Sequence, residues 1–287
     1  MRSASYRRAG SLTRRRGLPL VLGLVAAVCT ATVFGAINTV PDEGRHPAYG
    51  ALCVQQTEGD PWGCMPGGGT LVAPNIVLSF AHAAPHIGGA YRIGFTFDEI
   101  IGPNPVVYEA EKFVPDPGFF AMNPDDPHDI AVVLLKQDVP GIRPVLLPPI
   151  VGMLDNGHLA LKTFYTLVDR GPTTLEGWDG DVSTLPLLPG WTERRFGEAV
   201  AIELRAGAIM IGPDEKHPVT ACMGSGSLAL LTRTNIAVGI GSYYHTGALC
   251  GSPFAYTRLD TIQAYDFLKN YLPASLLPKY VIRAAGE

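Results

Sequence analysis

The sequence predicts an all-β body that is closed by one short helix near its C-terminus and preceded by an N-terminal segment of a different kind. Three observations predict this arrangement. Short apolar or alternating runs recur from about residue 46 to residue 260, and turn residues separate them. The chain holds 33 Gly and 25 Pro, which is high for a helical protein and normal for short strands and turns. No helical periodicity appears before residue 260, and many short strands without helices are typical of a β-barrel or sandwich.

Residues 1–36 are expected to form a signal peptide or a signal anchor. Six arginines precede an uncharged run over residues 17–37, and the first acidic residue is Asp42. A basic flank before a long apolar run is typical of a secretory signal, and the basic flank stays on the cytoplasmic side. The run is long enough to span a bilayer, so an uncleaved anchor stays open as an alternative, whereas small residues at Cys29 and Ala31 favour cleavage. The body is therefore expected to be secreted, or anchored to the outer face of the cell membrane.

The charge of the body argues against a nucleic-acid partner. The whole chain carries 22 basic and 26 acidic residues, a net charge of −4. Without the six N-terminal arginines, 16 basic residues remain against 26 acidic ones, a net charge of −10. Phosphate binding needs clustered Lys and Arg, which an acidic body does not favour. A membrane is expected as a partner only through an uncleaved N-terminal segment.

Four cysteines of the body predict two disulfides. They are Cys53, Cys64, Cys222 and Cys250, whereas Cys29 lies in the export segment. An even number of cysteines in an exported chain favours disulfides. Three connectivities are possible, and proximity in the sequence favours Cys53–Cys64 and Cys222–Cys250. Zinc is the alternative, but none of the four stands in a Cys-x-x-Cys pair.

The predicted strands follow one another along the body. Residues 91–97 show the pattern clearly, because Tyr91, Ile93 and Phe95 alternate with smaller or polar neighbours, as a half-buried strand requires. The other predicted strands cover residues 69–72, 76–80, 130–135, 159–167, 199–204, 208–211, 228–231 and 236–240.

One helix is expected over residues 260–272. Asp260 is suited to cap its start, and Gln263 three residues later completes a pattern like a capping box. The apolar residues that follow keep the spacing of one helix face, and Pro273 ends the run. Residues 273–287 are expected to form a loosely attached tail.

Three segments carry His, Asp and Ser where they suit nucleophilic catalysis. The first is a strand, a Pro-Asn turn and a second strand over residues 68–82, with His82 just past the strand end. The second places Asp129 at the start of a buried strand, and the third holds Ser225 between two glycines of a turn. A serine hydroxyl is a poor nucleophile until a base takes its proton, and an imidazole oriented by a carboxylate is such a base.

These segments resemble the trypsin-like serine protease family. The family patterns are G-T-L-[IV]-x-P-x-x-[IV]-L-T-A-A-H-C, D-I-A-L-L and C-x-G-D-S-G-[GS]-P, and the stretches here are GTLVAPNIVLSFAHA, DIAVVLL and CMGSGSL. The stretches PDEGRHP from residue 41 and YTRLD to residue 260 are similar to the start and end of a secreted bacterial branch. The resemblance covers about residues 41–272, in the family's order.

The resemblance implies a fold and an activity. It implies two six-stranded antiparallel β-barrels, over about residues 46–150 and 151–258, followed by the helix over residues 260–272. It implies an endopeptidase that hydrolyses polypeptide substrates through an acyl-enzyme, with no cofactor and no metal. The protein is expected to be a monomer.

The resemblance also assigns roles to the residues of the site. His82 is the expected general base, Asp129 orients its imidazole, and Ser225 is the nucleophile. Backbone N–H groups around Gly224 and Ser225 are expected to stabilise the oxyanion. Thr220 matches the residue at the base of the primary specificity pocket, so no acidic group is offered to Lys or Arg side chains and a trypsin-type preference is not expected.

The segments that surround the pocket depart from the family pattern. Ser242 and Tyr244 lie in the stretch that pairs with the substrate backbone, where Gly usually stands at the position of Tyr244. A tyrosine there is expected to narrow or block the primary pocket. Ala83 replaces the family's Cys after the histidine, so Cys64 is expected to pair elsewhere, with Cys53.

The nucleophile turn departs most. Counted from Cys222, Ser225 matches the family's nucleophile only if the Asp before it is deleted, and Leu228 replaces the family's Pro. The alternative hypothesis is therefore a catalytically inactive member, a pseudoprotease that keeps the fold to bind a protein or peptide ligand. A third hypothesis is an adhesion domain unrelated to proteases, which requires the three motifs to coincide by chance.

Overall fold

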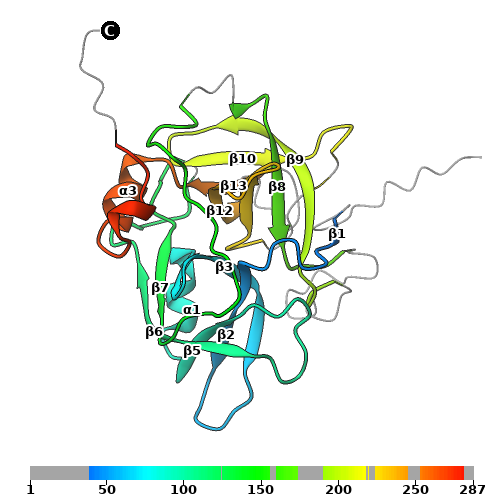
Figure 1. Cartoon of the computed structure of the whole chain (residues 1–287), viewed down its shortest axis with the longest axis vertical. Coiled ribbons are helices and arrows are strands. Elements are labelled where there is room, and N and C mark those ends of the chain that lie inside the picture. The colour runs from blue at the N-terminus through cyan, green and yellow to red at the C-terminus, as the bar shows by residue number, and fades with distance from the viewer. Residues whose placement is uncertain are drawn as a thin grey trace, which may run out of the picture. The chain divides into compact units, whose positions relative to one another are not determined.

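The computed structural model describes residues 39–123, 125–155, 160–173, 190–217, 219, 224–244 and 253–280. The expected export segment lies outside these residues. Within them, no helix has both the length and the apolar character needed to cross a bilayer. The described chain forms two barrels of antiparallel strands, one after the other along the sequence (Figure 1).

The first barrel is closed by six strands in the order β2-β3-β4-β7-β6-β5. Their bounds are β2 (Tyr49–Gln55), β3 (Gly63–Ala73), β4 (Ile76–Ser79), β5 (Arg92–Thr96), β6 (Val107–Pro115) and β7 (Ala131–Leu135). Inward-facing side chains such as Leu52, Leu71 and Phe95 are fully buried and fill the interior. Burial of this apolar surface is the main term that stabilises the barrel.

The second barrel is also closed by six strands, in the order β9-β10-β13-β12-β11-β8, with β8 paired back onto β9. Their bounds are β8 (Phe164–Asp169), β9 (Arg195–Leu204), β10 (Ala208–Gly212), β11 (Leu228–Leu231), β12 (Ala237–Tyr244) and β13 (Phe254–Arg258). A short strand, β1 (Val40–Pro41), adds to β9. The prediction of an all-β chain with two six-stranded barrels is thereby confirmed.

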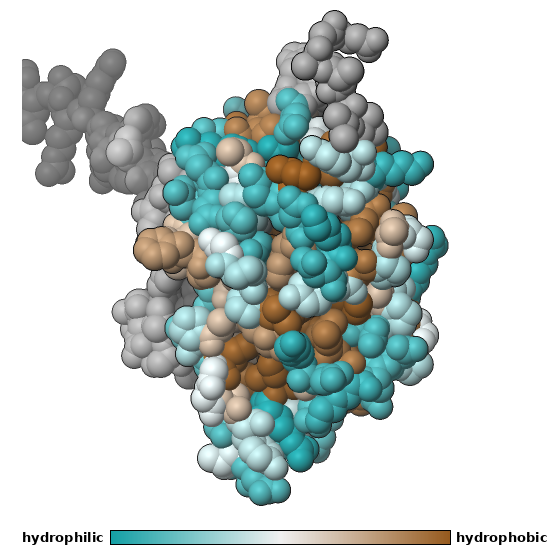
Figure 2. All heavy atoms as spheres, turned by 90° about the vertical axis from the view of Figure 1, so that its left-hand side faces the viewer, coloured by the Kyte–Doolittle hydropathy of each residue, from teal (hydrophilic) through white to brown (hydrophobic). Residues whose placement is uncertain are grey.

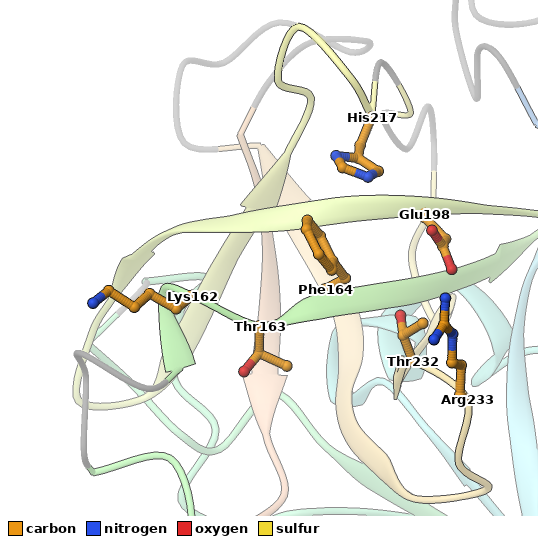
Figure 3. A pocket seen from close by; sticks show the side chains of 7 residues that line it. All are labelled: Lys162, Thr163, Phe164, Glu198, His217, Thr232 and Arg233. Carbon is orange, nitrogen blue, oxygen red and sulfur yellow. The ribbon is translucent and has the colours of Figure 1, made fainter.

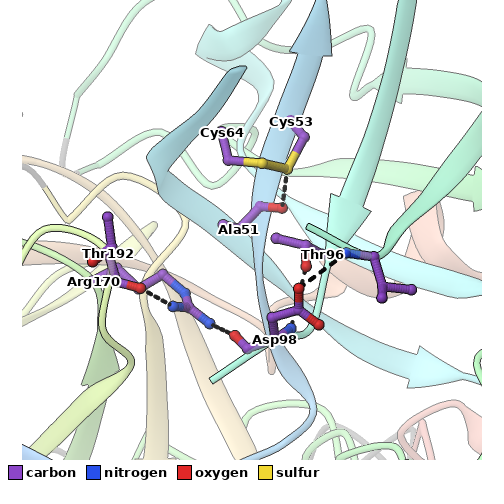
Figure 4. Close-up of a disulfide and its surroundings, with 8 residues drawn as sticks. Ala51, Cys53, Cys64, Thr96, Asp98, Arg170 and Thr192 are labelled. Atoms are coloured by element: carbon purple, nitrogen blue, oxygen red, sulfur yellow. Dashed lines mark hydrogen bonds between the residues drawn. A yellow bond between two sulfur atoms is a disulfide. The ribbon is translucent and has the colours of Figure 1, made fainter. Parts of the chain in front are cut away.

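Two buried arginines join the barrels. Arg194 and Arg170 come from the second half of the chain and donate to backbone carbonyls. These carbonyls belong to Tyr49, Phe97, Asp98, Glu99 and Thr192. Figure 4 shows the bonds from Arg170 to the carbonyls of Asp98 and Thr192. The Arg194 Nε atom also lies 2.8 Å from Asp42 Oδ2, and both side chains are almost fully buried. Each charge is therefore hydrogen-bonded, as buried charges must be.

The predicted disulfide between Cys53 and Cys64 is confirmed. The two cysteines stand opposite each other in the register of β2 and β3, and their sulfurs are bonded (Figure 4). The bond links two strands that already pair, so it constrains the hairpin between them. The second predicted disulfide, Cys222–Cys250, lies outside the described residues.

The C-terminal helix is shorter than expected, and its cap differs. α3 spans Ile262–Leu268, and the Thr261 Oγ1 atom accepts from the Ala264 N–H at 3.1 Å, so Thr261 is the N-cap. The prediction of Asp260 as the cap is wrong. Its carboxylate is buried, where it accepts from the Leu154 N–H at 2.6 Å and from the Arg258 guanidinium.

The tail after α3 packs on the body as far as it is described. A 3₁₀ turn, η3 (Ala274–Leu276), is followed by a β-bridge between Lys279 and Ile150. Leu276 and Leu277 pack against the main core. Residues 273–280 are therefore attached, contrary to expectation, and residues 281–287 lie outside the described part. On the side that carries α3, apolar atoms reach the surface over a broad area bordered by hydrophilic residues (Figure 2).

Candidate active site

His82 follows the end of β4. A 3₁₀ turn, η1 (Ala81–Ala83), carries the histidine, and the small side chains of Ala81 and Ala83 are buried beneath it. The Phe80 ring packs against the imidazole, with 4.4 Å between the ring centroids. The imidazole is partly buried, with 16% of the side-chain surface exposed.

Asp129 lies beside His82 because of strand pairing. β4 and β7 are antiparallel, and Ser79 stands opposite Ala131, so the residues after β4 and before β7 meet at one edge. The Asp129 side chain is almost fully buried. Its Oδ1 accepts from the His82 backbone N–H at 2.9 Å, and its Oδ2 lies 2.7 Å from Nδ1 of the ring.

Ser225 lies in a tight turn that precedes β11. Gly226 has φ +80°, a left-handed conformation that glycine adopts readily. The turn is held by backbone bonds from the Gly226 N–H to the Gly241 carbonyl, 2.7 Å, and from the Gly68 N–H to the Ser225 carbonyl, 3.1 Å. The Ser225 Oγ atom lies 3.0 Å from Nε2 of His82. The structure thus brings the three predicted residues together from both barrels.

The hydrogen bonds also assign the tautomer of the imidazole. A carboxylate oxygen only accepts, so Nδ1 of His82 donates to Asp129 and Nε2 is left to accept from the Ser225 hydroxyl. A second acceptor, the Ser242 carbonyl, lies 3.3 Å from the same hydroxyl. This arrangement allows the imidazole to take the hydroxyl proton.

Ser242 has a contact that the sequence did not reveal. Its side chain is buried in β12, and its hydroxyl donates a short hydrogen bond to Oδ2 of Asp129. The same oxygen contacts the imidazole, so Ser242 helps to orient the carboxylate. A serine within a strand carries no local sequence signal for such a contact.

The remaining predicted residues have different outcomes. Gly224 is buried beside Ser225, and no hydrogen bond within the described chain uses the backbone N–H of either residue. Both donors are thus free of other bonds there. Tyr244 is the last residue of β12 and stands opposite Phe254 in the register. Thr220 lies outside the described residues, as do the two cysteines of the second predicted disulfide.

A separate hollow lies on the outside of the second barrel. It has a volume of about 410 Å³. Phe164 and His217 are among its lining residues, and their ring centroids are 4.4 Å apart (Figure 3). Its other lining residues are Lys162, Thr163, Glu198, Thr232 and Arg233. None of the three residues at the hydrogen-bonded site lines it, and the sequence pattern did not mark it.

Comparison with solved structures agrees with the two-barrel architecture. A structure of HL collagenase matches with a TM-score of 0.60 and 16% identity, covering 82% of this chain and 97% of that one. A structure of GrC matches with a TM-score of 0.54 and 20% identity, covering 82% of this chain and 98% of that one. No protein-family model matches the sequence, and no curated protein is significantly similar to it. The chain therefore has the two-barrel fold of trypsin-like serine proteases.

Proposed function

We propose that this chain is a serine endopeptidase that hydrolyses peptide bonds through an acyl-enzyme on Ser225. One observation carries the proposal: hydrogen bonds run unbroken from the Ser225 hydroxyl through the His82 imidazole to the Asp129 carboxylate, at 3.0 and 2.7 Å. These residues lie far apart in the sequence, on two barrels. The two-barrel fold, which this chain shares with proteases of known structure, supports the proposal as well.

The proposed reaction has two halves, acylation of Ser225 and hydrolysis of the acyl-enzyme. The Ser225 Oγ atom attacks the carbonyl carbon of the substrate while His82 takes the hydroxyl proton. The backbone N–H groups of Gly224 and Ser225 stabilise the oxyanion that forms. The imidazolium then protonates the leaving amine, and the acyl-enzyme forms. Water then gives a proton to the same imidazole and attacks the ester carbon. The ester bond breaks, the imidazolium returns the proton to the Ser225 oxygen, and the carboxylic acid product leaves. Asp129 holds the imidazole and stabilises its charged form throughout.

The proposed substrate is a polypeptide outside the cell. An export segment and the disulfide between Cys53 and Cys64 fit an oxidising compartment. The protein is proposed to act as a monomer, secreted or held at the outer face of the membrane by an uncleaved N-terminal segment.

A second candidate function is binding of a protein or peptide without catalysis. The observation that favours it is the nucleophile turn, which lacks the acidic residue that precedes the serine in the family pattern. A turn that has lost the geometry for an oxyanion loses about a hundredfold or more in rate for each missing donor.

A fluorophosphonate probe separates the two candidates. The endopeptidase proposal predicts that the purified full-length protein reacts covalently at Ser225 and that Ser225→Ala abolishes the reaction. Ser275→Ala, a remote substitution in η3, is the control and is expected to react like the wild type. A folded wild-type protein that stays unlabelled overturns the endopeptidase proposal and favours the binding function.

A further inference from the structure

A buried carboxyl lies near the nucleophile turn and belongs to none of the groups described above. Asp169 ends β8, and 3% of its surface is exposed. Its Oδ1 atom accepts from the Tyr49 hydroxyl at 3.3 Å and from the Arg170 backbone N–H at 2.7 Å. Its Oδ2 atom is buried and has no hydrogen-bond partner in the described chain. A buried carboxyl with an unpaired oxygen is costly to keep, so a role for it is worth seeking.

Tyr49 connects this carboxyl to β3, the strand whose Gly68 N–H donates to the Ser225 carbonyl. The Tyr49 side chain is fully buried, and its hydroxyl oxygen would lie 3.0 Å from a Cβ atom placed on Gly68. The phenol therefore packs directly against the backbone of Gly68, whose N–H donates to the Ser225 carbonyl. A path of contacts thus runs from Asp169 through Tyr49 and Gly68 to the nucleophile.

Tyr256 holds the other side of the turn. The buried hydroxyl of Ser227 lies 3.3 Å from the Tyr256 hydroxyl, and the Tyr256 side chain is fully buried in β13. Burial and then the nearby charge of Asp169 raise the pKa of both Tyr49 and Tyr256. Asp169 therefore lies close to both phenols, which contact the turn through different residues.

We propose that Asp169 is a positioning residue for Ser225, acting through Tyr49. Its carboxyl fixes the phenol against Gly68 and so holds the 224–227 turn in the geometry that places the serine hydroxyl on His82. The turn has no acidic residue of its own next to the nucleophile, and Asp169 supplies a buried carboxyl from another strand. This inference rests on the proposed function, since it explains how the shortened turn keeps a reactive serine.

The protonation state of Asp169 sharpens the test. Burial raises its pKa to about 8, against the opposing effect of hydrogen bonds from Arg170 and Tyr49 and of the Arg170 charge. Near neutral pH the carboxyl is therefore mostly protonated. Its accepting oxygen is then like the carbonyl oxygen of an amide, so asparagine is expected to replace aspartate and leucine is not. The titratable groups that face it are Tyr49, Arg170 and Tyr256.

The experiment compares probe reaction at Ser225 in full-length variants at pH 7. Asp169→Leu and Tyr49→Phe are expected to react about tenfold or more slowly, because small displacements of a nucleophile are costly. Asp169→Asn is expected to stay within about threefold of the wild type, since its amide oxygen still accepts. Asp260→Leu removes an equally buried carboxyl away from the turn and serves as the matched control, with an unchanged rate in the folded protein.

A pH profile adds a readout that a purely structural role would not change. The ratio of the wild-type rate to that of Asp169→Asn is expected to change as pH passes through about 8, because the buried carboxyl ionises there and its hydrogen bond from the Tyr49 hydroxyl changes in strength. Identical profiles for the two proteins overturn the proposal. Equal rates for Asp169→Leu, Tyr49→Phe and the wild type overturn it as well.

Hydrogen exchange keeps the inference testable if the wild-type protein does not react with the probe. The backbone amides of Gly226 and Ser227, which donate to the carbonyls of Gly241 and Gly224, are expected to exchange about tenfold faster in Asp169→Leu and Tyr49→Phe than in the wild type and in Asp260→Leu. Faster exchange without probe reaction contradicts the endopeptidase proposal and supports the positioning role. Unchanged exchange in a folded variant contradicts the positioning role itself. If Asp169→Leu does not fold, Tyr49→Phe carries the test.

Discussion

At the scale of single residues, the reactive geometry depends on few contacts, and the Ser242 hydroxyl makes one of them. It donates to the same Asp129 oxygen that orients the His82 imidazole. A hydrogen bond to a charged group contributes about 1.5–3 kcal/mol, and its loss frees the carboxylate to turn. Ser242 thereby links β12 of the second barrel to the acid of the first.

Ser242→Ala is expected to slow probe reaction at Ser225 by about tenfold while the protein stays folded. The reason is that Asp129 then orients the imidazole less well. Labelling rates with circular dichroism as the check on folding measure this, and Ser275→Ala is the control. A rate equal to that of the wild type contradicts the role assigned to the Ser242 hydroxyl.

The conformation of the nucleophile turn also depends on Gly226. Its φ is +80°, and a Cβ atom there would lie 2.1 Å from the carbonyl oxygen of Gly68. Gly226→Ala is therefore expected to lower the free energy of unfolding by about 3 kcal/mol or more, from backbone strain plus a clash with backbone.

Gly59→Ala is the matched control for this substitution. Gly59 has φ +89°, but nothing lies within 4 Å of its added Cβ, so only the conformational cost of about 1 kcal/mol is expected. Urea unfolding curves of the two variants measure the difference. Equal losses would show that the close approach to Gly68 does not constrain the turn.

At the scale of elements, the hairpin of β2 and β3 connects the disulfide with the site. Cys53 and Cys64 pair near its tip, and Gly67 and Gly68, farther along β3, contact the nucleophile turn. The strand β3 is therefore held at two points, by a covalent bond and by the hydrogen bond to Ser225.

Replacing both cysteines by alanine is expected to lower the free energy of unfolding by about 2–3 kcal/mol, the usual value for a short closed loop. Thermal or urea unfolding under non-reducing conditions measures it. The wild type treated with reductant is expected to match the double variant. No change in stability would mean that the strand pairing alone constrains the hairpin.

Three barrel strands, β2, β6 and β13, are not among the predicted strands, for two different reasons. β2 and β13 are buried along almost their whole length, so apolar and polar residues do not alternate in them. β6 carries charged residues between its apolar ones and lies at intermediate exposure. Alternation of apolar and polar residues predicts strands with one solvent-exposed face. It does not predict strands that are buried on both faces or partly exposed on both.

At the scale of the whole molecule, two buried carboxyls give stability opposite dependences on pH. Burial opposes ionisation of Asp42, but hydrogen bonds from His46 and Arg194 hold its pKa at about 2. Burial raises the pKa of Asp169 to about 8. Both lie among the buried groups that join the two barrels.

The free energy of unfolding is therefore expected to fall at both ends of the pH range. The Asp42 contribution is complete above its unfolded pKa of 3.8 and is lost as pH falls from there through about 2. The Asp169 contribution has the opposite sign. Between pH 3.8 and about 8 the unfolded chain releases a proton that the folded chain keeps, so stability decreases as pH rises.

Denaturant titrations from about pH 2 to pH 9 check this dependence. Asp42→Asn is expected to weaken the loss at the acid end, and Asp169→Asn is expected to weaken the decline toward the alkaline end. A wild-type profile whose slope is unchanged by either substitution contradicts the assigned pKa directions. Each variant serves as the control for the other, because the two carboxyls titrate in different ranges.

The sequence by itself determined the fold class, one disulfide, and which three side chains meet. Strand periodicity indicated the all-β class, and the resemblance of three ordered motifs to the trypsin-like family implied that His82, Asp129 and Ser225 meet. Only the tertiary structure decided what surrounds them. Three contacts join residues distant in the chain: Ser242 with Asp129, the Leu154 N–H with the Asp260 carboxylate, and Tyr49 with Asp169. Such contacts depend on which strands the barrels bring together, and a single sequence carries no local signal of that choice.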